Sequence, residues 1–274
     1  MKRMLKIEIS RAFKNKALIF SLIIGTAIAS AQILFRVIPL SKEIDEYLFY
    51  NKPMAHIGWL FCAWIGGNLA SPENYLFYLL LPMLATIPFA DSFYCDRKSG
   101  YIKNVFIRAK KSHYYISKYI ATFISGGIAI FIPLLTNLAI SSLILPSMLP
   151  QASAGFFAVN NTSMWGELFY THPYIYIFLY MIIDFIFGGL FATISLVVGF
   201  IAEQRFIALI SPFIIYLFTF SLCNLLKAYK FSPMSFLVPG WGDTSSVIIF
   251  SEMLILGLIT FSYFVLKGVR NDTF

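Results

Sequence analysis

The sequence predicts an all-α polytopic membrane protein with six transmembrane helices, and three observations support this prediction. Apolar residues make up 59% of the 274 residues and charged residues 12%, whereas soluble globular domains average about 45–50% and about 25%. Apolar runs of about 20 residues recur, which is the length that a helix needs to cross a bilayer. The Lys and Arg residues gather beside these runs. The formal net charge of +8 therefore indicates control of membrane orientation, and we expect no nucleic acid partner.

Residues 1–16 are predicted to form an amphipathic helix that lies on the inner surface of the membrane. Apolar side chains cluster on one arc of this helix, while Lys2, Lys6 and Lys14 form a stripe at spacings of four and eight residues. Glu8 breaks this pattern. A disordered basic leader is the alternative interpretation of the segment.

The first span covers about residues 17–37 and carries Arg36 near its outer end, where a long side chain can reach water. The next segment, residues 38–74, is the most acidic of the chain and is expected outside. Within it, residues 55–70 are apolar but short for a crossing, and they contain two Trp, which favour the membrane interface. A crossing here would also place the two basic clusters on opposite sides. We therefore expect residues 55–70 to be interfacial or re-entrant.

Five further apolar segments complete a single predicted transmembrane domain over residues 1–274. These spans cover about residues 74–90, 114–145, 173–201, 206–226 and 247–266. Because the number of spans is even, both termini lie on the side of the basic clusters. Lys and Arg are retained in the cytoplasm, so that side is predicted to be cytoplasmic.

A basic loop follows the second span. Residues 91–118 contain seven Lys or Arg and two Asp. We expect residues 91–98 to be helical and to end at Ser99-Gly100, since glycine favours helix termination. A short amphipathic helix then carries one apolar face, formed by Tyr101, Ile102, Val105 and Phe106. Its other face carries Lys103, Asn104 and Arg108. The apolar face suits a soluble partner, with burial in lipid as the alternative.

A few residues inside the predicted spans are candidates for a pathway or gate. Asp184 lies near the middle of its span, where an ionisable group usually faces a cavity or a partner. A hydrogen-bonded packing role is the alternative for Asp184. Gly188 and Gly189 form a candidate hinge. Glu252, in the outer third of the last span, and Arg36 complete the set, and Arg36 could pair with either acid.

The sequence offers no catalytic or metal site. It contains no P-loop for ATP phosphates, no H-E-x-x-H zinc motif and no G-x-S-x-G nucleophile motif. The three Cys are scattered, and the three His lie far apart. We therefore expect no enzymatic activity of the chain by itself and no metal or other cofactor on it.

With these elements in order, the chain resembles the membrane subunit of an ABC-2 type (type V) ABC exporter. That family has a basic amphipathic helix before six spans, and its first cytoplasmic loop carries a coupling helix that docks on an ATPase subunit. Its loop motif is matched in position by Asp96-Arg97-Lys98-Ser99-Gly100-Tyr101, followed by Arg108, Lys110 and Lys111. Asp96 stands where Glu is more usual. Residues 231–246 resemble the family's short re-entrant helices in placement, whereas the long segment 38–74 is a departure.

The resemblance implies a division of labour between subunits. Two permeases, identical or paralogous, would pair in the bilayer with two separate P-loop ATPase subunits that bind ATP and Mg. Residues 91–113 would form the cytoplasmic coupling loop of a multi-pass protein in a bacterial cytoplasmic membrane. The coupling residues would be Arg97, Lys98, Gly100, Tyr101, Ile102, Val105, Phe106 and Arg108.

The substrate expected from this resemblance is amphiphilic. We favour export of an antimicrobial peptide or bacteriocin, or immunity to one, with drugs and polysaccharides or glycolipids as alternatives. A secondary transporter or channel, or a non-transporting membrane scaffold, are the alternatives outside the family. A secondary transporter would be expected to show several intramembrane charges and an internal repeat, whereas the predicted spans carry one midplane Asp.

Overall fold

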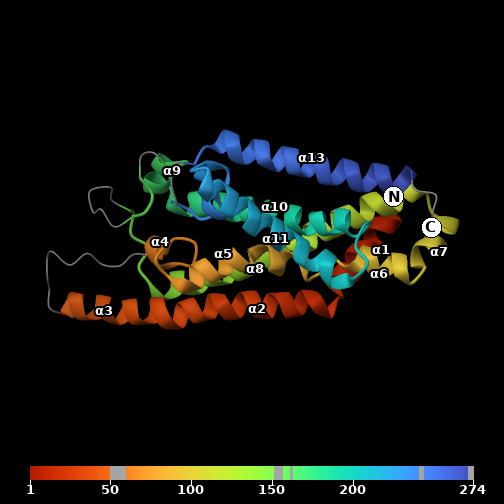
Figure 1. Ribbon diagram of the computed structural model, residues 1–274. Coiled ribbons are helices and arrows are strands. Elements are labelled where there is room, and N and C mark those ends of the chain that lie inside the picture. Colours follow the sequence, from red (N-terminus) through yellow and green to blue (C-terminus); the bar gives the residue numbers. More distant parts are fainter. Residues whose placement is uncertain (50–59, 151–156, 161–162, 241–243, 271–274) are drawn as a thin grey trace.

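The protein is an elongated bundle of helices (Figure 1). The computed structural model describes residues 1–49, 60–150, 157–160, 163–240 and 244–270, and all regular structure within them is helical. Both ends of the chain lie at one end of the bundle, together with α1 (Lys2–Phe13), α6 (Ser92–Lys98) and α7 (Tyr101–Arg108). We call this the terminal end. The opposite, distal end carries α3 (Ile38–Phe49), α4 (Leu60–Ala63) and α9 (Gly166–Thr171).

Five helices are long and apolar enough to cross a membrane. They cover Lys16–Ile44, Lys111–Ile144 (α8), Pro173–Val198 (α10), Arg205–Leu225 (α11) and Ser246–Arg270 (α13). The multi-pass character predicted from composition is therefore compatible with the structure. A sixth apolar helix, α5 (Pro72–Thr86), has 15 residues, fewer than the about 20 that a full crossing takes. The shorter helices are α4 (Leu60–Ala63), α9 (Gly166–Thr171), η3 (Tyr229–Phe231) and α12 (Pro233–Phe236).

The first long helix does not end where the sequence suggested. We expected a span over residues 17–37, but α2 (Lys16–Gln32) continues through a π-helical turn, η1 (Ile33–Val37), into α3 (Ile38–Phe49). The N–H of Ile38 bonds the carbonyl of Ile33, five residues back. This wider turn stands directly before Pro39, whose ring would clash with the preceding turn of a regular α-helix. The helix thus passes a proline that the sequence pattern marks as a boundary.

The two helices at the centre of the bundle, α8 and α10, meet at small residues. A Cβ added to Gly126 would stand 2.6 Å from the Cβ of Ala192 and 3.0 Å from the carbonyl oxygen of Gly188. A Cβ at Gly189 would stand 2.7 Å from the carbonyl oxygen of Phe123. Small residues at such crossings let two helix backbones approach closely, which is how helices associate in membranes. Gly188 and Gly189 therefore let α10 pack closely on α8, and their role as a hinge stays a prediction.

Most residues of the segment 60–66 are buried in the distal end of the bundle. Leu60 and Ile65 are fully buried, and Trp64 is 1% exposed. Trp64 therefore packs inside the protein, while residues 55–59 lie outside the described part of the chain. Whether this segment is interfacial or re-entrant stays a prediction. Burial within protein is the condition under which irregular backbone is tolerated at membrane depth.

Amide side chains hold the backbone of this buried segment. Asn137 Oδ1 accepts the N–H of Ile65 at 2.9 Å, and Asn137 Nδ2 donates to Gln32 Oε1 at 2.8 Å. Gln32 Nε2 donates in turn to the carbonyl of Ala63, and Asn74 Nδ2 donates to that of Ile65. Helices α2, α5 and α8 thus satisfy backbone groups that irregular structure leaves open.

We predict that Gly126→Ala destabilises the protein while Gly257→Ala does not. The new methyl group at position 126 meets backbone and cannot be accommodated without moving α8 from α10, which costs about 1–3 kcal/mol in well-packed cores. At Gly257 the nearest atom stands 3.5 Å away, so the higher helix propensity of Ala should dominate. Thermal unfolding of the detergent-solubilised variants checks this. Equal effects of the two substitutions would contradict the close α8–α10 crossing.

Candidate functional site

The predicted helix–stop–helix is present at the terminal end. Helix α6 ends at Lys98, Gly100 adopts a left-handed conformation with φ 73°, and α7 begins at Tyr101. Glycine is favoured at this position because it has no Cβ to clash in the left-handed region. The chain therefore turns sharply between two short helices beyond the long apolar ones, as Figure 1 shows.

One face of α7 packs on the bundle and the other is exposed. Ile102 is buried in a cluster with Tyr114, Tyr115 and Phe264, and Tyr101, Val105 and Phe106 pack partly against this cluster. The exposed face carries Lys103, Asn104, Ile107 and Arg108. The apolar face that we expected to meet a partner thus mainly anchors α7. The residue missed by sequence reasoning is Ile107, which is 82% exposed between basic side chains.

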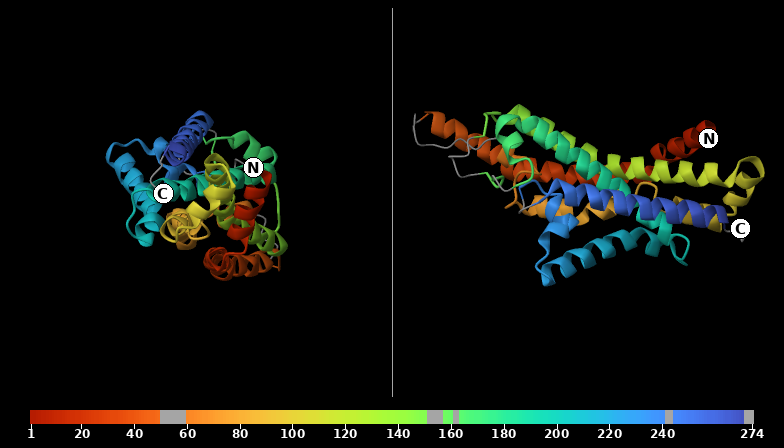
Figure 2. Two further views of the ribbon diagram at one scale, coloured as in Figure 1. Left: turned by 90° about the vertical axis from the view of Figure 1, so that its right-hand side faces the viewer. Right: turned by 90° about the horizontal axis from the view of Figure 1, so that it is seen from above.

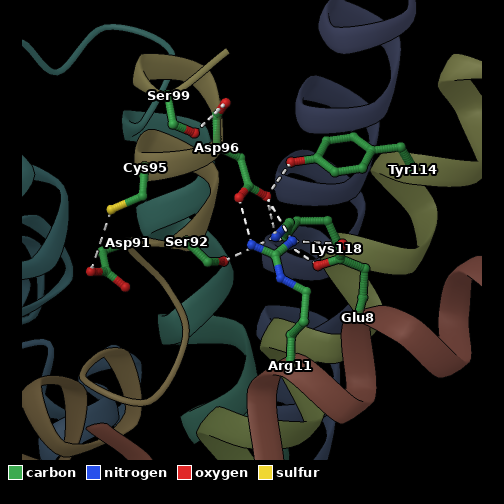
Figure 3. Close-up of polar contacts among 9 residues, drawn as sticks. All are labelled: Glu8, Arg11, Asp91, Ser92, Cys95, Asp96, Ser99, Tyr114 and Lys118. Carbon is green, nitrogen blue, oxygen red and sulfur yellow. Dashed lines mark hydrogen bonds and ion pairs between the residues drawn. The ribbon is translucent and has the colours of Figure 1, made fainter. Parts of the chain in front are cut away.

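Asp96 of α6 is the centre of a buried polar site (Figure 3). Arg11 of α1 binds it through two nitrogens, with Nη2 at 2.6 Å from Oδ1 and Nη1 at 3.1 Å from Oδ2. Lys118 of α8 donates to Oδ2 at 2.7 Å, and the Tyr114 hydroxyl donates to the same oxygen at 2.8 Å. A two-pronged Arg contact is both strong and directional. Asp96 therefore joins α1, α6 and α8.

Glu8 balances the charge of this site. Its carboxylate lies 2.7 Å from Lys118 Nζ and 2.9 Å from Arg11 Nη1. Glu8 and Lys118 are completely buried, and the Lys118 ammonium also lies 4.5 Å from the centre of the Phe89 ring. We call Glu8, Arg11, Asp96 and Lys118 the charge cluster. Two acids and two bases leave it without net charge, which is the condition for burying ions at acceptable cost.

Contacts within the charge cluster shift the pKa values of Asp96 and Arg11. Burial by itself raises the pKa of Asp96, but hydrogen bonds and charge attraction from Arg11 and Lys118 outweigh burial, so the pKa is lowered. Burial lowers the pKa of Arg11, and the two carboxylates Asp96 and Glu8 more than reverse this. Asp96 is therefore ionised at neutral pH, and the ion pairs are formed.

Helix α6 is also tied to the turn between α10 and α11. Arg97 donates to the carbonyls of Phe200 and Ala202 at 2.7 and 2.9 Å, which satisfies backbone acceptors just beyond the end of α10. The Tyr94 hydroxyl donates to the carbonyl of Glu203 at 2.6 Å. Asp91 pairs with Arg205 at the start of α11. Arg97 thus links α6 to this turn, whereas Lys98 remains exposed.

Asp184 lies fully buried in α10, away from the charge cluster. Its Oδ2 accepts the Tyr78 hydroxyl at 3.3 Å, and its Oδ1 has no hydrogen-bond partner among the described residues. The Tyr216 hydroxyl donates to the carbonyl of Tyr78 at 3.0 Å, so α5, α10 and α11 meet here. A buried carboxyl group with so few partners is one that functional sites in membranes often contain.

The remaining candidates are not brought together. Arg36 pairs with Glu73, with Nε at 3.4 Å from Oε2, instead of with Asp184 or Glu252. Glu252 is half-buried in α13. The pairing of Arg36 with Asp184 or Glu252 was thus predicted wrongly, and the role of these residues in a pathway or gate stays a prediction.

Three residues of the charge cluster escaped the sequence interpretation, and Arg11 among them was not singled out at all. Glu8 broke the amphipathic pattern of the N-terminal helix, and that break was its signal. Lys118 was counted with the basic loop, although it lies within α8 and is fully buried. Among the described residues, no group of three His, Cys, Asp or Glu is placed to bind a metal ion.

No protein-family model matches the sequence. No curated protein matches it either.

We predict that Lys118→Gln destabilises the fold strongly. The substitution leaves Arg11 as the one positive charge of the cluster for two buried carboxylates, Glu8 and Asp96. Removing one partner of a buried ion pair costs about 3–5 kcal/mol. Arg36→Gln, which breaks the exposed pair with Glu73, should cost only about 0–1 kcal/mol. Chemical unfolding in detergent compares the two. A similar loss of unfolding free energy in both variants would contradict the conclusion that the charge cluster stabilises the fold.

The lowered pKa of Asp96 predicts a contribution that depends on pH. A carboxyl group whose folded pKa is lowered stabilises the protein above its unfolded pKa, about 3.9, and this stabilisation is lost as the pH falls through the folded pKa. The unfolding temperatures of wild type and Asp96→Asn should therefore differ at neutral pH and converge below about pH 4. Glu73→Gln serves as the control with an exposed partner. A difference that persists unchanged into acid would contradict the ionised state of Asp96.

Proposed function

We propose that the protein is the permease subunit of an ATP-driven exporter of the ABC-2 type. The observation that carries this proposal is helix α7, which is anchored on the bundle by one face and presents Lys103, Ile107 and Arg108 on the other. An apolar side chain 82% exposed between basic groups is suited to docking on a separate protein. In this proposal the partner is a P-loop ATPase subunit, which supplies ATP and Mg.

The attachment of α6 supports transmission of force from such a partner. Helix α6 is held to α1 and α8 by the charge cluster, and to the turn after α10 by Arg97 and Tyr94. A displacement of α7 would therefore move several helices together. For ATP binding to bias the permease, these contacts must differ in free energy between its two states.

The architecture of the working complex is part of the proposal. Two copies of the permease, or this chain and a paralogue, pair in a bacterial cytoplasmic membrane with two ATPase subunits. Helix α5 and the turn after it, over about residues 74–90, serve as the second of six crossings, and both termini face the cytoplasm. The basic residues at the terminal end support this orientation.

The substrate class in this proposal is amphiphilic, with an antimicrobial peptide or bacteriocin favoured over a drug, polysaccharide or glycolipid. A distal cavity lined by Phe61, Trp64, Phe169 and Tyr176 offers a mainly apolar, aromatic surface, but its volume of about 10 Å³ suits one water molecule. An amphiphile would therefore need a path that opens on movement or between two permease copies.

Asp184 favours a second candidate function, a secondary transporter driven by an ion or proton. Its Oδ1, which has no hydrogen-bond partner in the part of the chain that the structure describes, lies within a long apolar helix. Transporters place coupling residues in such helices. Purification of the tagged chain from its native membrane in mild detergent separates the two candidates. A co-purifying P-loop ATPase at equal stoichiometry supports the exporter, whereas a stable chain that purifies alone supports the secondary transporter or a scaffold.

We predict that Ile107→Glu abolishes stimulation of the partner ATPase without loss of fold. The side chain is largely in solvent, so its replacement leaves the bundle intact, while a carboxylate in the docking face repels an acidic partner surface. Ile102→Glu, in the same helix but facing inward, should instead unfold the terminal end. ATPase assays and thermal unfolding on both variants check this. Full stimulation in the folded Ile107→Glu variant would remove α7 as the docking helix.

A further inference from the structure

We propose that the outward face of α1 binds anionic lipid headgroups at the membrane surface. We call the exposed residues on this face the outer arc, and they are Lys2, Arg3, Lys6, Ile7, Phe13 and Lys14. The opposite face packs on α8 through Met4, Glu8 and Ala12, which are buried at four-residue spacing. Helix α1 therefore has one face inside the protein and one that is free for a ligand.

The charge of the outer arc is unbalanced. Glu8 is the only acid between residues 1 and 14, and it points inward, where Lys118 and Arg11 neutralise it. The four cations of the outer arc form no ion pair with any described residue. Burial of the acid thus leaves a cationic surface whose complement is an anion supplied from outside the chain.

The position of α1 along the bundle places this surface at headgroup depth. Helix α1 joins α2 through Asn15, whose side chain donates to the carbonyl of Pro88 at 2.8 Å and so fixes the corner. The exposed apolar side chains of α2 begin one turn later, with Ile19 and Phe20 more than half exposed. If those side chains face lipid tails, α1 lies where the tails end and the phosphates begin.

The apolar members of the outer arc favour lipid over a soluble anion. Ile7 and Phe13 are 41% and 42% exposed between the cations. Cations interleaved with exposed apolar side chains are typical of helices that lie in the plane of a membrane surface. Free phosphate or a nucleic acid would engage the charges but would leave both apolar side chains in water. Figure 2 shows α1 along the flank of the bundle at its terminal end, a placement that suits contact with a surrounding membrane.

Lipid binding would act on the candidate functional site through the other face of α1. Arg11 and Glu8 both belong to the charge cluster, and Arg11 holds Asp96 at the base of the helix pair α6 and α7. Headgroups that hold the outer arc in place would therefore stabilise Asp96 in its buried position. This inference depends only on the membrane location of the bundle and not on an ATPase partner.

The test compares two lipids on the purified full chain. We would titrate phosphatidylglycerol or phosphatidylcholine into detergent micelles and follow thermal unfolding. Phosphatidylglycerol should raise the unfolding temperature at low concentration, and added salt should weaken this effect because exposed charges are screened. The triple variant Lys2→Gln, Lys6→Gln, Lys14→Gln should need a roughly hundredfold higher concentration for the same rise.

A matched control removes three cations elsewhere at the terminal end. This control is the triple variant Lys103→Gln, Arg108→Gln, Lys110→Gln. It should respond to phosphatidylglycerol as the wild type does. Three results would each overturn the proposal. The wild type and the outer-arc variant could respond equally to phosphatidylglycerol, or the two lipids could raise the unfolding temperature of the wild type equally. Inorganic phosphate or RNA could also produce the full rise in unfolding temperature. If the triple variant fails to fold, the salt dependence of the wild-type response to the two lipids tests the proposal instead. A rise in unfolding temperature that salt does not weaken would also overturn the proposal.

Discussion

The terminal end of the bundle depends on the ion pairs of one buried ammonium group. The Lys118 side chain has no exposed surface and lies in a long apolar helix. Its charge is tolerable only because Glu8 and Asp96 both stand 2.7 Å from its ammonium group. Each acid needs Arg11 as well, since one ammonium does not satisfy two carboxylates. Removing any member would leave an uncompensated charge in a medium of low dielectric constant. The four residues therefore specify one arrangement of α1, α6 and α8, and the position of α7 follows from it.

The two ends of the bundle use different chemistry for the same purpose. At the distal end, Gln32, Asn74 and Asn137 hold the buried segment 60–65 with neutral amide groups. At the terminal end, the residues that hold α6 are charged. Neutral amides cost less to bury than ions, while ions are more selective for partner and geometry. Charged residues hold the short helices at the terminal end. This arrangement is consistent with a role of the terminal end in contacts outside the bundle.

The sequence predicted the helices more reliably than their partners. Apolar runs identify α8, α10, α11 and α13 because a spanning helix is signalled by every residue in it. The stop at Gly100 was also predictable, since one residue carries the conformational reason. The continuation past Pro39 was not, because the π-helical turn that accommodates it leaves no mark in composition. Nor were the pairs Glu8–Lys118 and Arg11–Asp96, since ion pairs between helices distant in sequence depend on how those helices cross.

The tight crossing of α8 and α10 limits which parts of the bundle can move. Gly126 and Gly188 bring the two backbones so close that a sliding motion would drive side chains into carbonyl groups, and packed cores resist such deformation. Helices α8 and α10 therefore act as one body, to which the charge cluster and Arg97 both attach α6. Helices α11 and α13 are largely exposed along their length, with 22% and 17% of their most apolar stretches buried. Any opening that serves transport is thus expected beside α11 and α13, against lipid or a second copy, and Asp184 lies on the face where α10 meets α5 and α11.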